Sequence, residues 1–181
     1  MKIRYGLGLL GAFVVQSAFL GWMVADRAIL LANGAEVRLK VVPVDPRDLF
    51  RGDYVTLAYE IERLDTAELA GDDRFDRDAP VYVTLEPRGE DWAATAIARQ
   101  PPDGGTFIAG RIVDTPPEAG TTYRVSYGLE RFFVPEGTGR ELERLRNDQR
   151  VSVDVAVDRG GRTALKRLLV DGEPRFEEPL Y

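Results

Sequence analysis

Residues 43–61 read PVDPRDLFRGDYVTLAYEI, in which dense turn chemistry leads directly into a strand pattern. Pro43 and Pro46 hold the residues before them extended, so the chain arrives straight and then bends. Asp followed by Pro favours a type I turn at residues 45–48, and Gly52 can supply a positive φ. Apolar side chains then share one face at alternate positions, which predicts a half-buried strand over residues 53–61: Val55, Leu57, Tyr59 and Ile61.

Gly52 to Tyr59 read G-D-Y-x-x-L-x-Y, and with these residues the chain resembles the GDYXXLXY family of membrane-anchored bacterial proteins. The resemblance extends to the preceding Pro-x-Asp-Pro-Arg-Asp, to residues 130–137 and to the apolar N-terminus. It implies an anchored protein of a functionally uncharacterised family, whose members are often encoded beside multi-pass membrane proteins. The motif residues, for which we expect structural roles, are Pro43, Asp45, Pro46, Arg47, Asp48, Arg51, Gly52, Asp53, Tyr54, Leu57 and Tyr59.

An apolar segment near the N-terminus predicts a membrane anchor. Residues 6–25 carry no charge and one strongly polar side chain, Gln16, over about 30 Å of helix, the thickness of a bilayer core. We favour an uncleaved transmembrane helix over a cleaved signal peptide. The apolar run exceeds the usual length of the hydrophobic region of a signal peptide, and residues 23–25 make a poor cleavage site.

The charges beside the anchor predict its orientation. Lys2 and Arg4 precede the apolar segment and place the N-terminus in the cytoplasm by the positive-inside rule. The helix should continue a turn or two, until Asn33-Gly34 ends it in a left-handed cap. We therefore expect a single-pass protein of the bacterial inner membrane with a periplasmic C-terminal domain. The chain divides into residues 1–33, with the anchor and its helical extension, and residues 34–181, the extracytoplasmic β domain.

Small or polar residues form two rows at a four-residue spacing within the anchor. Such rows let a second membrane helix approach closely, and a glutamine can hydrogen-bond across the contact. Small residues are also common in any membrane helix, so this partner contact is a hypothesis. The two rows are Gly8, Ala12 and Gln16, and Ser17, Gly21 and Ala25.

The remainder of the chain reads as short strands. Alternating or short apolar segments occur at residues 37–41, 53–61, 81–85, 92–98, 106–113, 123–127, 132–134, 151–157 and 163–170. We predict a hairpin between 92–98 and 106–113, and another between 151–157 and 163–170. One short helix is expected at 138–147. About eight or nine strands with closely spaced turns indicate a mainly β fold of the sandwich or barrel kind.

The residue inventory excludes several kinds of site. The chain has no cysteine and no histidine, which removes disulfides, Cys-ligated zinc and Ser-His or Cys-His nucleophiles. Its net charge of −6 argues against nucleic-acid binding. The aspartates of residues 72–78 lack the order of a calcium loop. We therefore expect no cofactor and no metal.

Two catalytic designs remain to be weighed against a non-catalytic role. A Ser-Lys dyad is disfavoured, because Ser17 lies in the anchor while Ser126 and Ser152 lie in predicted strands rather than loops. Acidic residues in and after the turn offer an acid-base pair, although turn chemistry accounts for their positions. These carboxylates are Asp45, Asp48, Asp53 and Glu60.

The aromatic residues have either core or contact roles. Tyr54 and Tyr59 point to opposite faces by parity, so we expect one of them in the core with its hydroxyl hydrogen-bonded. Arg131, Phe132 and Phe133 form either a docking patch or part of the core. We predict a non-catalytic interaction or accessory subunit of a larger, multi-pass membrane protein. The alternative is a carboxylate-based hydrolase acting on cell-envelope polymer.

Overall fold

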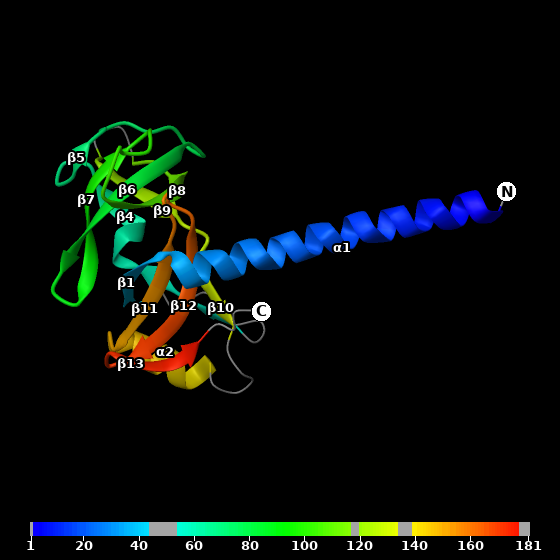
Figure 1. The fold of residues 1–181 in the computed structure, drawn as a ribbon. Helices are drawn as coiled ribbons and strands as arrows, with labels where there is room; N and C mark the ends of the chain where they lie inside the picture. Colours follow the sequence, from blue (N-terminus) through cyan, green and yellow to red (C-terminus); the bar gives the residue numbers. More distant parts are fainter. Residues whose placement is uncertain (1, 44–53, 117–119, 134–138, 178–181) are drawn as a thin grey trace.

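The computed structural model describes residues 2–43, 54–116, 120–133 and 139–177. A single long helix, α1 (Lys2–Asn33), projects from a β domain and meets it only at its C-terminal end (Figure 1). Within α1, the segment Leu10–Asn33 is long and apolar enough to cross a membrane. Because α1 continues from the end of the apolar segment at residue 25 to Asn33, the predicted helical extension is confirmed.

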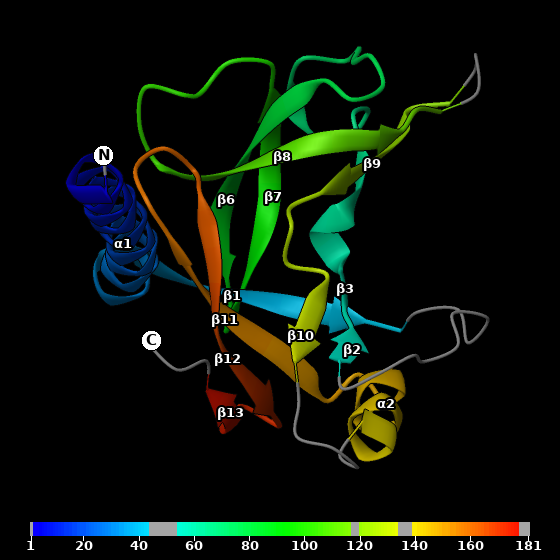
Figure 2. The ribbon, with the colours of Figure 1, turned by 90° about the vertical axis from the view of Figure 1, so that its right-hand side faces the viewer.

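Most of the domain consists of two antiparallel-rich sheets, which Figure 2 shows one above the other. The five-stranded sheet has the order β13-β12-β11-β1-β3, and the six-stranded sheet has the order β4-β9-β8-β6-β7-β5. A two-stranded sheet, β10-β2, lies beside them. The bounds are β1 (Ala35–Val42), β2 (Tyr54–Thr56), β3 (Ala58–Tyr59), β4 (Arg63–Asp65), β5 (Ala70–Gly71), β6 (Pro80–Arg88), β7 (Asp91–Ala98), β8 (Thr106–Asp114), β9 (Thr122–Ser126), β10 (Arg131–Phe133), β11 (Val151–Val157), β12 (Thr163–Val170) and β13 (Glu173–Glu177).

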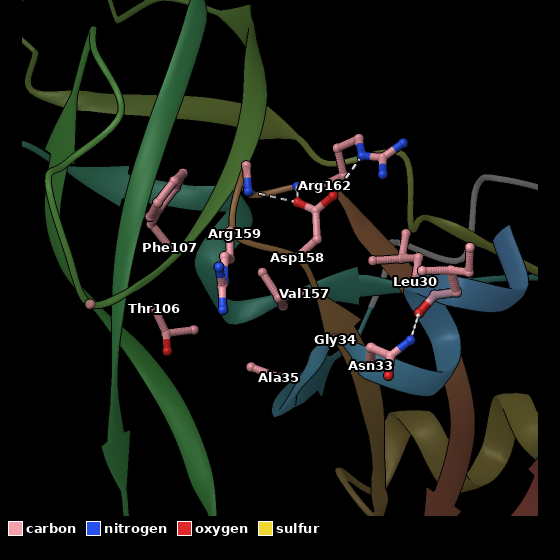
Figure 3. A pocket seen from close by; sticks show the side chains of 13 residues that line it. Leu30, Asn33, Gly34, Ala35, Thr106, Phe107, Val157, Asp158, Arg159 and Arg162 are labelled. Atoms are coloured by element: carbon pink, nitrogen blue, oxygen red, sulfur yellow. Dashed lines mark hydrogen bonds and ion pairs between the residues drawn. The ribbon is translucent and has the colours of Figure 1, made fainter. Parts of the chain in front are cut away.

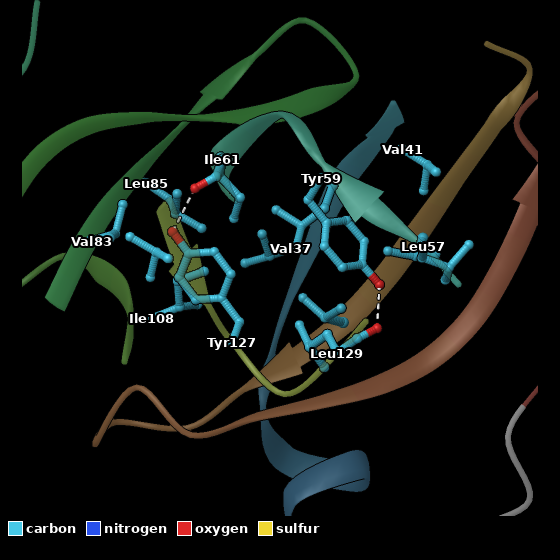
Figure 4. Close-up of a cluster of buried hydrophobic side chains, with 14 of the residues drawn as sticks. Val37, Val41, Leu57, Tyr59, Ile61, Val83, Leu85, Ile108, Tyr127 and Leu129 are labelled. Carbon is cyan, nitrogen blue, oxygen red and sulfur yellow. Dashed lines mark hydrogen bonds between the residues drawn. The ribbon is translucent and has the colours of Figure 1, made fainter. Parts of the chain in front are cut away.

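Side chains from both large sheets meet in one apolar core, part of which Figure 4 shows. In β1, Val37, Leu39 and Val41 are buried and alternate with more exposed neighbours, as the sequence pattern predicts. From the other sheet, Val83 and Ile108 are fully buried against the same cluster. The mainly β, sandwich-like fold class is confirmed.

The strand expected over residues 53–61 is divided in two. β2 pairs with β10, whereas β3 pairs with β1, and between them the N–H of Leu57 donates to Glu130 O at 2.9 Å. The chain therefore changes sheets at Leu57 and enters the 3₁₀ turn η1 (Glu60–Glu62). The predicted alternation survives this break, since Leu57, Tyr59 and Ile61 are all buried.

The hairpin predicted between residues 92–98 and 106–113 is wrong, because β6 lies between β7 and β8. Gly89 has φ +70° in the two-residue connection between β6 and β7, so the tight turn forms there instead. The longer connection at residues 99–105 carries the chain past one strand to reach the far side of β6. The hairpin of β11 and β12 is confirmed.

The strand count exceeds the prediction because several strands are too short to show periodicity. β3 and β5 have two residues each and β4 has three. The predicted short helix is confirmed as α2 (Gly139–Asn147). Its Leu142 packs in the core, and Arg146 is buried and donates from Nη1 to Thr56 O at 2.9 Å, which joins α2 to β2.

Candidate functional site

A single residue, Gly34, connects α1 to β1. Its N–H donates to Leu30 O at 2.9 Å, and Asn33 Nδ2 donates to Ile29 O at 3.2 Å. The left-handed cap expected here is wrong, since Gly34 is not among the glycines with positive φ. A Cβ at Gly34 would lie 2.9 Å from the Cβ of Ala156 and 2.7 Å from Leu30 O. The glycine is therefore required for close approach of α1 to β11.

A small apolar cluster fixes the end of α1 on the five-stranded sheet. Leu30 and Leu31 are only 7% and 1% exposed, and they pack on Ala156 of β11 and Ala164 of β12. Burial of a leucine side chain stabilises a contact by about 1.5–3 kcal/mol. The small alanines let the helix lie close to both strands, so the two leucines hold α1 against the domain.

An ion-pair network joins α1 to the turn between β11 and β12. Arg162 Nη1 lies 2.8 Å from Asp26 Oδ2, and Arg162 Nε lies 2.6 Å from Asp158 Oδ2. Hydrogen bonds to Asp26 and Asp158 raise the pKa of Arg162. Burial opposes ionisation of Asp158, but hydrogen bonds from Arg162 and from the Gly160 N–H hold its pKa below the ordinary value. Arg162 therefore stays charged and connects the helix to the turn.

A pocket of about 690 Å³ opens at this junction (Figure 3). One wall is the last turn of α1, the second is the β11–β12 turn and the third is the start of β8. In Figure 3 the side chain of Arg159 points into the pocket between Thr106 and Val157, whereas Arg162 points away from it. The lining residues are Ile29, Leu30, Asn33, Gly34, Ala35, Gly105, Thr106, Phe107, Val157, Asp158, Arg159, Gly160 and Arg162. We call this the junction pocket.

A second pocket, of about 870 Å³, lies among loops of the six-stranded sheet. Arg99 donates from Nη2 to Arg74 O at 2.6 Å and stands 5.8 Å from the centre of the Phe75 ring. The hydroxyl of Tyr123 donates to Asp73 O at 3.3 Å. These polar groups hydrogen-bond to the loop at residues 73–76 and hold it in place. We therefore assign them a structural role rather than a role in binding a ligand.

Most of the predicted motif residues lie outside the described residues. This applies to Asp45, Pro46, Arg47, Asp48, Arg51, Gly52 and Asp53. Pro43 is exposed at the end of β1, and Tyr54 begins β2, although its side chain is not described. Leu57 and Tyr59 are buried in the core, as expected for structural motif residues.

Two buried tyrosines lock the centre of the core (Figure 4). The hydroxyl of Tyr59 donates to Leu129 O at 2.7 Å, and that of Tyr127 donates to Ile61 O at 2.7 Å. Burial raises the pKa of both hydroxyls well above the ordinary value, so both remain protonated donors. The prediction of a core tyrosine with a satisfied hydroxyl is confirmed for Tyr59. Tyr127 was not predicted, because its partner is a backbone carbonyl distant in sequence.

Glu62 and Glu130 are the two carboxylates that interact electrostatically near these tyrosines. Glu130 accepts hydrogen bonds from Ser126 Oγ and from the Tyr127 N–H, both at 2.7 Å. Glu62 accepts from the Tyr59 N–H at 3.0 Å. Neither residue lines the two pockets described above. Both side chains cap backbone turns, which is a structural use rather than the open acid-base pair that a hydrolase requires.

The carboxyl of Glu62 should make stability depend on pH. Burial raises its pKa to about 7, so the folded protein binds a proton more tightly than the unfolded chain does. The contribution is full below pH ~4.5 and is lost as the pH rises to about 7. Between pH 5 and 8 the unfolding free energy of the wild type should fall by about 1–3 kcal/mol because of Glu62. In Glu62→Gln, which has no carboxyl at this position, this fall should be smaller. Urea unfolding at several pH values measures this, and an unchanged slope in the variant would contradict it.

The predicted partner contacts fall into two groups. Ala12, Gln16, Ser17, Gly21 and Ala25 are exposed on α1, and Gly8 lies in the same helix with its surroundings not described. Phe132 is 5% exposed and belongs to the core, so the docking role considered for it is wrong. Arg131 is exposed, while Phe133 lies in β10 with its side chain outside the described part.

Acidic side chains do not gather into a metal centre in the described segments, where no three are placed to hold an ion. Comparison with curated proteins and with solved structures finds no significant match. The family model described as "GDYXXLXY protein" matches residues 16–168, which is more than half of the chain. The match begins inside α1 and ends in β12, so it includes the helix end, the junction, the six-stranded sheet and the five-stranded sheet except for β13 and the end of β12. The chain belongs to the GDYXXLXY family.

Proposed function

We propose that this is a single-pass protein of the bacterial inner membrane with a periplasmic β domain. It acts non-catalytically, as an accessory subunit of a larger, multi-pass membrane protein. The observation that carries the proposal is that α1 leaves the domain unbroken, with large apolar side chains exposed along it. Phe13, Val15 and Trp22 are 67%, 70% and 64% exposed, an arrangement suited to lipid or to other membrane helices.

The rows of small residues favour contact with a helix over contact with lipid alone. A Cβ placed on Gly21, in the second row, would meet nothing within 4 Å, so this position is open to an approaching backbone. Phe19 and Met23 lie two residues from Gly21, about 200° around the helix, on the opposite face. α1 therefore carries the row Ser17, Gly21 and Ala25 on one face, which we call the small-residue face, while Phe19 and Met23 lie on the face of the other row, Gly8, Ala12 and Gln16. Because bulky side chains interrupt that other face, the small-residue face is the better helix-packing surface.

Leucines on the small-residue face should weaken recovery of the partner. We expect the double variant Gly21→Leu, Ala25→Leu to lower co-purification of a multi-pass membrane protein at least about fivefold, the effect of losing ~1 kcal/mol of helix packing. The measurement is a tagged pull-down from crosslinked native membranes, with quantitative mass spectrometry. The full chain is used, because both variant positions lie in the anchor.

The matched control is Phe19→Leu, Met23→Leu, which changes the opposite face with the same residue type. This control should recover the partner as the wild type does. If both double variants recover it equally, or if the wild type recovers no multi-pass protein, the accessory-subunit proposal fails. Loss with both variants would mean that the whole helix surface, rather than the small-residue face, carries the contact.

A further inference from the structure

The junction pocket lies at the depth of lipid headgroups if α1 spans the membrane as proposed above. The apolar segment ends at residue 25, and Ile29 and Asn33 follow about 6 and 12 Å further along a helix parallel to the bilayer normal. The polar layer adds roughly 5–8 Å to each side of the hydrocarbon core. The mouth of the pocket at Ile29 is then within that layer, and the base at Asn33 is just beyond it.

The lining of this pocket combines apolar and cationic groups. Ile29, which is 60% exposed, supplies apolar surface at the α1 wall, and Phe107, which is 7% exposed, adds a small apolar edge at the β8 wall. Arg159, Arg162 and Asp158 are the charged residues of the lining, and because Arg162 is paired with Asp158 and with Asp26 on the rim, Arg159 is the cation of the lining that these carboxylates leave available. A phospholipid presents the same two chemistries at this depth, a phosphate and the first carbons of its acyl chains.

The two arginines have different roles. The guanidinium of Arg162 is engaged by Asp26 and Asp158 on the rim. Arg159 is exposed, points into the pocket, and is paired with no carboxylate among the described residues. Its guanidinium is thus the group in the lining that remains to bind an anion.

The backbone that carries Arg159 is held in place on both sides. Asp158 Oδ1 accepts from the Gly160 N–H at 2.8 Å, and the Asp158 N–H donates to Arg162 O at 3.0 Å. The Ala109 N–H donates to Gly161 O at 2.8 Å, which fastens the tip of the turn to β8. A fixed turn lowers the entropy cost of ordering the arginine around a ligand.

We propose that the junction pocket binds one phospholipid from the surrounding membrane. The phosphate contacts the guanidinium of Arg159, and the glycerol and upper acyl chains lie on Ile29 and Phe107. The bound lipid fills the space between α1 and the domain and ties the domain to the membrane surface. This inference rests on the proposed membrane anchor, but it does not depend on any protein partner.

Arg159→Gln should weaken binding of a phospholipid about tenfold, the effect of losing one charge-assisted hydrogen bond. The test uses the full chain, purified in detergent, freed of lipid and titrated with phosphatidylglycerol under native mass spectrometry. Arg159→Lys keeps the charge and should retain binding closer to the wild type. Arg88→Gln, outside the pocket at the end of β6, is the matched control and should bind as the wild type does.

Four results would overturn the proposal. Equal affinity of Arg159→Gln and wild type, with equal unfolding midpoints, would show that the arginine does not hold the lipid. Displacement of the lipid by an equal concentration of glycerol 3-phosphate would mean that the pocket takes a soluble phosphate. A wild-type chain that fails to insert into lipid nanodiscs would remove the membrane premise, and the accessory-subunit proposal with it. Insertion without selective binding would remove only the lipid site.

Discussion

Replacing Asp154 with alanine is expected to lower the free energy of unfolding by about 2–3 kcal/mol, because Arg38 and Arg167 lose charge-assisted hydrogen bonds to a buried carboxylate. Asp154 lies in β11 with 1% of its side chain exposed. It accepts hydrogen bonds from Arg38 Nε at 2.9 Å and from Arg167 Nε at 2.8 Å. Burial opposes ionisation of Asp154, but these two bonds hold its pKa below the ordinary value. Urea unfolding of the full chain in detergent, at neutral pH, measures the loss.

The exposed pair of Arg150 and Asp171 provides the control for this prediction. Their side chains are 48% and 51% exposed, and exposed ion pairs contribute about 0–1 kcal/mol. Arg150→Ala should therefore change the unfolding free energy by less than about 1 kcal/mol. If Asp154→Ala lowers the unfolding free energy no more than Arg150→Ala does, the buried ion pairs of Asp154 contribute no more to stability than an exposed pair, which would contradict the prediction.

Replacing Gly34 with valine is expected to separate α1 from the domain. Any Cβ at this position meets Leu30 O, Ala156 Cβ and the Val157 N within 3.0 Å, and two of these three atoms belong to backbone. Overpacking of this kind costs about 1–3 kcal/mol, and we expect the upper part of that range. Leu30 and Leu31 would then leave their places on Ala156 and Ala164. Hydrogen exchange should show faster exchange at the end of α1, with the β core still protected.

Gly104→Val is the matched control for this substitution. A Cβ at Gly104 meets nothing within 4 Å, and this glycine is not among those with positive φ. It should leave exchange at the end of α1 unchanged. Equal exchange in Gly34→Val and the wild type would mean that the close approach at Gly34 does not hold the helix in place.

Local patterns in the sequence predicted where helices and strands lie more reliably than which strands pair with each other. The apolar segment predicted α1, and the valine alternation at residues 151–157 predicted β11, because both signals come from consecutive residues. The strand order was less accessible. β7 and β8 are successive in sequence, yet they do not pair with each other, because β6 lies between them. The two-residue turn after β6 pairs β7 with β6, and β8 then pairs with the other edge of β6.

The cap predicted at Gly34 is wrong because this glycine is needed for a close contact with another strand, not for a positive φ. Asn33-Gly34 is typical of a left-handed helix cap, but Gly34 is present because Ala156 comes close from a strand more than 100 residues away. The same applies to Arg159 and to Asp154, whose surroundings are assembled from separate strands. No spacing rule along the chain identifies such contacts, so the junction pocket was found only in three dimensions.

The most direct test is whether α1 and the β domain form one rigid body when the chain is placed in a lipid bilayer. The chain has no cysteine, so spin labels can be placed at Met23→Cys in α1 and Arg88→Cys in β6 without a background. Pulsed electron paramagnetic resonance in nanodiscs then gives the distance distribution between the two labels. We predict one narrow peak for the otherwise wild-type chain and a broad distribution when Gly34→Val is added. A broad distribution without that substitution would contradict the account.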